Sequence, residues 1–177
     1  AIYMNAKEGF ISGHVGSPVE RIEDFRLLRG QGKYTDDYYL EGMLHACIVR
    51  SNVAHGILRG IDGTAALKIP GVRAVYTGAD IIAALGAIPR IPMRLAPLQE
   101  LVPFEQPVLT DGRIRYVGEP LAIVLADTAA LAEDALEAVI VDIVPLPAVT
   151  KRDNADADGI FLFDPLVKSN CAFTFMG

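Results

Sequence analysis

The segment that most constrains the fold is residues 121–144, which reads LAIVLADTAALAEDALEAVIVDIV. It begins and ends with apolar runs, 121–126 and 139–144, and both are predicted to be strands because they are rich in β-branched residues. Between them lies a segment with helical spacing that Asp127 or Thr128 would cap. Its apolar stripe consists of Ala132, Ala135, Leu136 and Val139. This order predicts a βαβ unit near 121–144, provided that both strands join one sheet.

The region before this segment also carries strand and helix signals. Residues 43–50 are predicted to form a strand with two mostly apolar faces, as in a strand that is covered on both sides. Asp62 is expected to cap a short helix that Pro70-Gly71 ends. Further strands are predicted at 57–61, 72–77 and 113–117, and further short helices near 21–28 and at 79–85.

Other regions lack a regular period. Residues 86–107 contain five prolines, which argue against a central strand or a long helix there. Such a long irregular excursion is often functional or interfacial. Residues 1–35, rich in glycine and charge, are predicted to be an extended arm. Residues 151–177 are expected to be a polar linker followed by an apolar piece that is too short to form a domain.

Composition excludes several classes of function. A formal charge of −6 without a basic run argues against nucleic-acid binding, which needs clustered Lys and Arg. No apolar window is long enough to span a bilayer, and the N-terminus lacks a signal-peptide pattern. The two cysteines, Cys47 and Cys171, show neither CxxC spacing nor the count of a secreted scaffold. The chain is therefore expected to be soluble and cytoplasmic, with a reduced pair of thiols.

The stretch DDYYLEGMLHACIVRSNVAHG raises the question of a metal or nucleophilic centre. His45 and Cys47 would share one strand face, but a zinc or iron site needs three or four converging ligands. His55 lies beyond a turn, and nothing in the sequence directs it back to this pair. Because free cysteine is usually buried, Cys47 is interpreted as a small core residue rather than as a reactive thiol. No metal-binding residue is predicted.

Two further candidates for chemistry are similarly incomplete. The string GQGKY at residues 30–34 lacks both the spacing of a phosphate-binding loop and a preceding strand, so it is interpreted as a turn. Glu119 lies between two apolar strands and precedes a proline, where burial would raise the pKa of its carboxyl. The favoured alternative is a carboxylate that satisfies turn N–H groups, with Arg115 and Tyr116 beside it. No catalytic or cofactor-binding residue is predicted.

Several strings taken together resemble a known family. They are GQGKYTDD, EGMLHACIVRSNVAHG, IDGTAALKIPGVRAVYTGAD, RIRYVGEPLAIVLADT and LAEDALEAVIVDIVPLPAV. Their order and spacing resemble the N-terminal α/β hammerhead domain of the large subunit of molybdenum hydroxylases, the xanthine dehydrogenase, aldehyde oxidase and carbon monoxide dehydrogenase family. The resemblance covers about residues 16–150.

The resemblance implies an α+β fold with a mixed sheet. It also implies an arm at 1–35, a hammerhead domain at 36–150, and a linker with the start of a truncated molybdopterin-binding region at 151–177. The complete large subunit of such an enzyme carries a molybdenum–pterin cofactor. It hydroxylates aldehydes, purines or N-heterocycles, or oxidises carbon monoxide. The family's cofactor and catalytic motifs lie downstream, so this chain alone is expected to be structural and inactive.

The expected partners are the downstream molybdopterin-binding domains, a small iron–sulfur subunit and a medium FAD subunit. The loops 51–56 and 118–120 and the excursion 86–107 are predicted to form interfaces. The individual interface residues predicted are Ser51, His55, Arg115, Tyr116, Gly118, Glu119 and Pro120. One alternative is a free-standing binding or assembly module with the same fold and no redox chemistry. A small hydrolase that uses Glu119 or Cys47 is the weakest alternative, because no base, nucleophile and oxyanion set can be assembled.

Overall fold

The computed structural model describes residues 21–92, 99–110, 112–156 and 159–174. The chain divides into two units, residues 1–41 and 42–177, and each is described on its own. The first 20 residues of the predicted arm lie outside the described residues. The domain boundaries predicted at 35/36 and 150/151 stay predictions.

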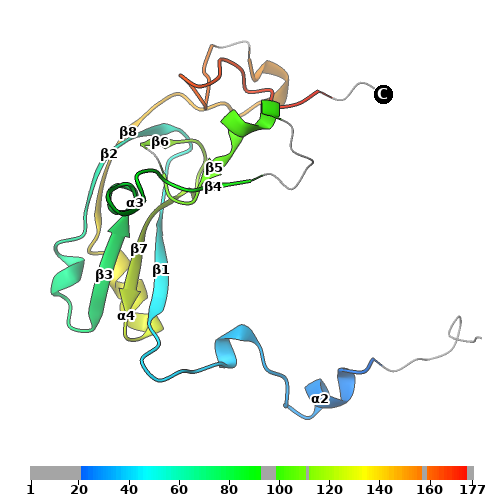
Figure 1. The fold of residues 1–177 in the computed structure, drawn as a ribbon, viewed down its shortest axis with the longest axis vertical. Helices are drawn as coiled ribbons and strands as arrows, with labels where there is room; N and C mark the ends of the chain where they lie inside the picture. The colour runs from blue at the N-terminus through cyan, green and yellow to red at the C-terminus, as the bar shows by residue number, and fades with distance from the viewer. Residues whose placement is uncertain (1–20, 93–98, 111, 157–158, 175–177) are drawn as a thin grey trace, which may run out of the picture. The chain divides into compact units, whose positions relative to one another are not determined.

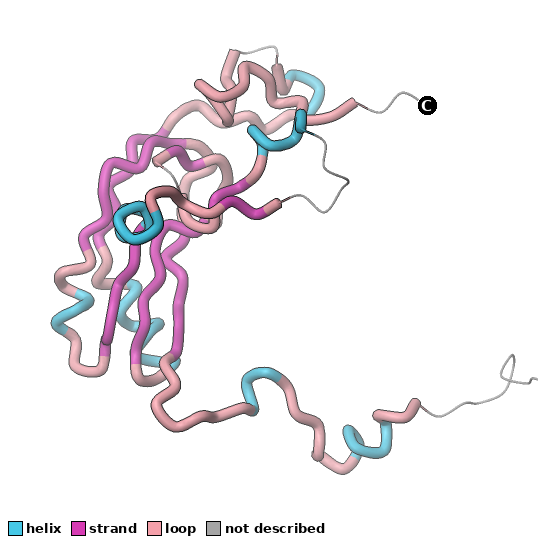
Figure 2. Tube along the Cα trace, viewed as in Figure 1, coloured by secondary structure: helices cyan, strands magenta, loops and turns pink. Residues whose placement is uncertain are grey.

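The described part of the first unit is mostly loop (Figure 2). Its helix α2, Asp24–Leu28, confirms the helical turn predicted near 21–28 and has no buried residue. A 3₁₀ turn follows at Thr35–Asp37, where the N–H of Tyr34 donates to the carboxylate of Asp37 at 2.8 Å. Local hydrogen bonds, rather than a buried core, therefore define this unit.

The second unit contains two three-stranded sheets (Figure 1). In the first sheet, β7 (Pro120–Ala126) lies between β1 (His45–Arg50) and β3 (Val72–Thr77), and both pairings are antiparallel. In the second sheet, β2 (Gly56–Asp62) lies between β6 (Arg113–Ile114) and β8 (Ile140–Pro145), again with antiparallel pairings. The uncharged run of β7 suits its central position, because both of its edges are paired.

Short elements complete the fold. Helix α3, Gly78–Leu85, begins at Thr77, whose hydroxyl and backbone N–H form a reciprocal cap with Asp80.

The excursion 86–107 contains a 3₁₀ segment, Gln99–Phe104, and a small hairpin of β4 (Arg90–Ile91) with β5 (Gln106–Pro107). The sequence predicted that this excursion forms no long helix and no central strand, and its described residues agree with that prediction. Another 3₁₀ turn, Ala66–Lys68, replaces the helix that Asp62 was expected to cap. The described residues after β8 form loop and a short 3₁₀ turn, Arg152–Asn154 (Figure 2).

Helix α4, Ala129–Leu136, covers one face of the first sheet (Figure 1). Its N-cap is Thr128, one of the two residues that the sequence predicted for this role, and its hydroxyl accepts from the N–H of Leu131 at 3.2 Å. Ala132 and Ala135 are fully buried against the sheet. The shared core also contains Val49, Val72, Ile114, Leu121, Val124 and Val139. Burying a side chain of this size contributes about 1.5–3 kcal/mol, so this core is the main source of stability.

The α+β class is confirmed, but the βαβ unit predicted at 121–144 is wrong. The strand–helix–strand order exists, yet β7 lies in the first sheet and β8 in the second. The edges of β7 are occupied by β1 and β3, so β8 pairs with β2 instead. All strand pairs in the described residues are antiparallel, so the predicted mixed sheet is replaced by antiparallel sheets.

The strand predicted over 43–50 is present as β1, but only one of its faces is covered. His45, Cys47 and Val49 face the core, whereas Ala46, Ile48 and Arg50 are exposed. The prediction that both faces of this strand are covered is therefore correct for the inner face and wrong for the outer face in the described structure. No helix among the described residues is long and apolar enough to cross a membrane.

Candidate functional site

Two of the predicted interface loops, 51–56 and 118–120, meet at the end of the β1–β7 pair. The N–H of Ser51 donates to the carbonyl of Glu119 at 3.0 Å, and the N–H of Gly118 donates to the carbonyl of Ser51 at 2.8 Å. The guanidinium of Arg50 donates to the carbonyl of Gly118 at 2.8 Å. Gly118 has a φ of 87°, in the left-handed region that favours glycine. The corner that leads into Pro120 is thus fixed by backbone hydrogen bonds.

The carboxylate of Glu119 lies inside this corner and is only 2% exposed. It accepts the backbone N–H of Arg115, and its other oxygen lies 3.6 Å from the Arg115 guanidinium. Burial raises the pKa of this carboxyl, and the bonded N–H and the charge of Arg115 partly offset that rise. Both interpretations offered for Glu119 therefore apply: it satisfies a turn N–H, and its pKa is raised. This hydrogen bond also ends β6 at Ile114, so the strand predicted over 113–117 is shorter than expected.

Arg115 and Tyr116 connect the corner to other segments. The buried guanidinium of Arg115 lies 4.9 Å above the ring of Phe163 and donates to the carbonyl of Arg113 at 2.9 Å. Phe163 in turn packs edge-on against Phe104, with 5.2 Å between ring centroids. The Tyr116 hydroxyl, on a partly exposed side chain, donates to the side chain of Gln106 at 3.4 Å. Phe163 could not be paired with Arg115 from the sequence, because the two are 48 positions apart.

His55 forms a second buried polar centre. Its Nδ1 lies 2.7 Å from the carbonyl of Pro147, which can only accept, so Nδ1 carries the proton. Its Nε2 lies 3.2 Å from the guanidinium of Arg113 and therefore acts as the acceptor. A pocket of about 320 Å³ adjoins the ring. Asp164 and Lys168 also line this pocket, and Asp164 lies 4.0 Å from Arg113.

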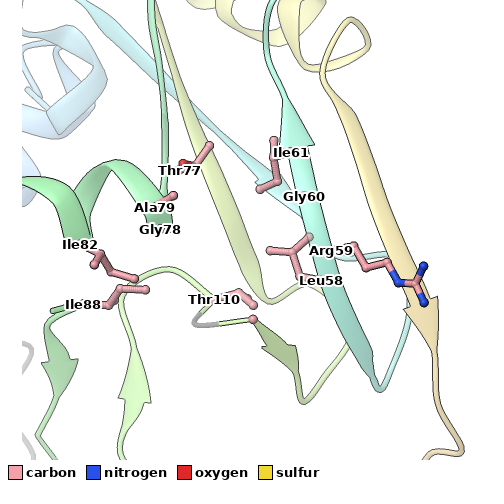
Figure 3. A pocket seen from close by; sticks show the side chains of 11 residues that line it. Leu58, Arg59, Gly60, Ile61, Thr77, Gly78, Ala79, Ile82, Ile88 and Thr110 are labelled. Atoms are coloured by element: carbon pink, nitrogen blue, oxygen red, sulfur yellow. The ribbon is translucent and has the colours of Figure 1, made fainter.

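An apolar groove of about 390 Å³ separates β2 from α3 (Figure 3). In this view the side chains of Leu58 and Ile61 are directed toward α3, whereas Arg59 is directed away across β8. Ile82 of α3 lies on the opposite side of the groove, beside Ile88. No motif in the sequence indicates this groove, because it arises from the separation of two elements that are distant in the chain.

The residues considered for metal or nucleophilic chemistry do not form a centre. In the described part of the chain, no three His, Cys, Asp or Glu side chains could together hold a metal ion. His45 and Cys47 share the inner face of β1 as predicted, while the ring of His55 is engaged by Pro147 and Arg113. Cys47 and Cys171 are free thiols.

Of the seven predicted interface residues, Ser51, His55, Arg115 and Glu119 are buried, so their observed contacts are internal. As interface residues, all seven stay predictions.

Comparison with known proteins identifies one family. A model described as "Aldehyde oxidase and xanthine dehydrogenase, a/b hammerhead domain" matches residues 29–147. The nicotine 6-hydroxylase large subunit of Paenarthrobacter nicotinovorans is 41% identical over 135 residues, which cover 76% of this chain and 16% of that protein. The carbon monoxide dehydrogenase large chain of Hydrogenophaga pseudoflava is 39% identical over 127 residues, which cover 72% of this chain and 15% of that protein.

Solved structures give the same result. Quinoline 2-oxidoreductase from Pseudomonas putida superposes with a TM-score of 0.66 and 40% identity, over 79% of this chain and 17% of that one. The aldehyde oxidoreductase from Desulfovibrio desulfuricans superposes with a TM-score of 0.72 and 28% identity, over 86% of this chain and 17% of that one. The chain spans about a fifth or less of the length of the curated relatives that it matches.

Proposed function

We propose a function that follows from the family of this chain, which belongs to the aldehyde oxidase and xanthine dehydrogenase a/b hammerhead domain family. In this proposal the chain serves as the architectural domain of a molybdenum hydroxylase large subunit. The observation that carries the proposal is the 41% identity to a nicotine 6-hydroxylase large subunit over 135 residues. The reaction proposed for the whole subunit is hydroxylation of an aldehyde, purine or N-heterocycle, or oxidation of carbon monoxide.

The contacts of the buried polar groups support an architectural role. Glu119 and Arg115 connect the β6–β7 corner to Phe163, and His55 connects the start of β2 to Pro147. The Arg115–Phe163 and His55–Pro147 contacts link segments that are distant in sequence. These contacts would hold the segments of the second unit together where it meets its neighbours.

Among the described residues, no cluster of His, Cys, Asp or Glu side chains could ligate a metal ion directly, and Glu119 and His55 are engaged by this chain's own atoms. No reaction step is therefore assigned to residues of this chain. We propose that cofactor-binding domains elsewhere in the large subunit hold the molybdenum and pterin.

Two of the reported relatives are named for N-heterocyclic substrates, nicotine and quinoline, and another for carbon monoxide. These compounds are the first to assay for the whole enzyme. The proposed partners are a small subunit with iron–sulfur clusters and a medium subunit with FAD, in a cytoplasmic complex. A relative named as the gamma subunit of a dehydrogenase complex supports such an assembly.

Metal analysis of the full-length gene product tests the proposal. The purified protein is expected to contain molybdenum and a releasable pterin, and to reduce an artificial electron acceptor with at least one of these substrates. A full-length protein without molybdenum and pterin would falsify the proposed function. It would favour the alternative, a free-standing assembly module with the same fold.

A further inference from the structure

The first sheet has one covered face and one open face. The covered face carries Cys47, Val49 and Val124, which pack on the core. The open face consists of two rows of side chains set by the strand register. One row is Ile48, Ile123 and Tyr76, and the other is Ala46, Leu125 and Ala74.

These six residues are uncharged, whereas Arg50, which follows on the same face of β1, is charged and donates to the carbonyl of Gly118. Ile48 is 37% exposed and Tyr76 is 50% exposed, although each stands directly beside the half-buried Ile123. None of the six residues belongs to the buried core or to the residues packed against it. A contiguous apolar face of this kind on a soluble domain usually marks a surface for another protein element.

The β1 strand supplies a second indication. Its sequence is mostly apolar on both faces, with His45 on one and Arg50 on the other, a pattern typical of strands that are covered on two sides. Within the described residues, β1 pairs only with β7, so its outer edge also lacks a strand partner. The open face and this edge therefore adjoin each other on the same element.

We propose that the open face is the surface on which another domain of the same large subunit docks. The inference rests on the proposed function and adds to it the face that this domain uses. The curated relatives contain at least four-fifths of their length outside the region matched here, which supplies protein that could cover the face. Because these two rows offer no charge to pair, the occupant presents apolar side chains of its own over them.

The test uses the full-length large subunit and hydroxyl-radical footprinting of Tyr76. In the wild-type subunit, modification of Tyr76 is expected to be lost, because the docked domain excludes water from it. Ile48→Glu places a charge in the same row and is expected to restore modification of Tyr76 or to prevent assembly of the folded subunit. Ile48→Ala keeps the face apolar and shortens the contact, so a partial restoration is expected if the charged variant does not fold.

Ile140→Glu is the matched control. Ile140 lies on β8 in the second sheet, is 64% exposed, and is therefore expected to accept the charge without changing Tyr76 modification. Ready modification of Tyr76 in the wild-type subunit overturns the proposal. The proposal is also overturned if Tyr76 is protected in the wild-type subunit and stays equally protected in both Ile48 variants. Protection that disappears on dilution assigns the face to a second copy and also overturns it. Molybdenum content is measured in the same samples: molybdenum with a reactive Tyr76 refutes the docking face alone, and a protected Tyr76 without molybdenum refutes the enzymatic function alone.

Discussion

The backbone N–H of Arg115 donates to the carboxylate of Glu119, four residues later, and both side chains are buried. This one contact ends a strand, shapes a corner and places a carboxylate beside a guanidinium. It also accounts for a glutamate directly before the apolar β7, because the turn needs an acceptor where the strand ladder stops.

Replacement of Glu119 by alanine is expected to lower the free energy of unfolding by about 2–4 kcal/mol, because the Arg115 N–H loses its acceptor and the guanidinium loses its counter-charge. Urea unfolding followed by circular dichroism measures the change. Glu133→Ala, on the exposed face of α4, is the matched control and is expected to change stability little. An equal effect of the two substitutions would contradict the role assigned to Glu119.

The raised pKa of Glu119 predicts a specific pH dependence. Because the folded state holds the proton more tightly than the unfolded state does, the stabilising effect of protonation is fully present below the ordinary pKa of 4.5. It is lost as the pH rises through the raised value. Glu119→Gln keeps an acceptor oxygen but does not titrate. The stability of the wild type relative to Glu119→Gln is therefore expected to fall as the pH rises above 4.5, and a flat difference would show that the carboxyl is not perturbed.

Loss of the His55 ring is expected to loosen the segment after β8. His55→Ala removes the hydrogen bonds to Pro147 and Arg113 and leaves a buried space, at a cost of about 2–4 kcal/mol. Hydrogen exchange is expected to accelerate most in residues 146–168. His45→Ala, on the half-buried inner face of β1, is the comparison, and it is expected to leave the exchange of that segment unchanged.

Gly78 is predicted to tolerate no side chain. A Cβ at this position would lie 2.7 Å from the carbonyl oxygen of Thr110, so the backbone of one segment must move. Gly78→Ala is expected to cost about 1–3 kcal/mol, which corresponds to a fall of roughly 2–12 °C in melting temperature for a chain of this size. Gly60 meets nothing within 4 Å and has no positive φ, so Gly60→Ala is the control with little expected change. Similar melting temperatures for the two variants would refute this close approach.

Local elements were predictable from the sequence because local residues determine them. The strand Val72–Thr77 and the cap of α4 at Thr128 follow from β-branching and from a hydroxyl placed before a helical stripe. Sheet membership was not predictable in this way. Whether β7 and β8 share a sheet depends on which strands occupy the edges of β7, and those strands lie far away in the sequence.

The candidate site was predictable only in part. The loops around Ser51 and Glu119 were predicted to form interfaces, which stays a prediction, and the structure shows that the side chains of these two residues are buried. The partners of His55 lie 58 and 92 residues away, a distance over which no spacing rule applies. The groove beside α3 and the open face of the first sheet likewise depend on tertiary geometry that a single sequence does not display.

The central position of β7 has a consequence for synthesis on the ribosome. Strands β1 and β3 leave the exit tunnel before β7. They do not pair with each other in the sheet, so each lacks its partner until β7 has been synthesised. The sheet cannot close until translation has passed Ala126. During that interval two apolar segments stay unpaired in the nascent chain, which makes this early stage of biosynthesis the point at which chaperones would be needed.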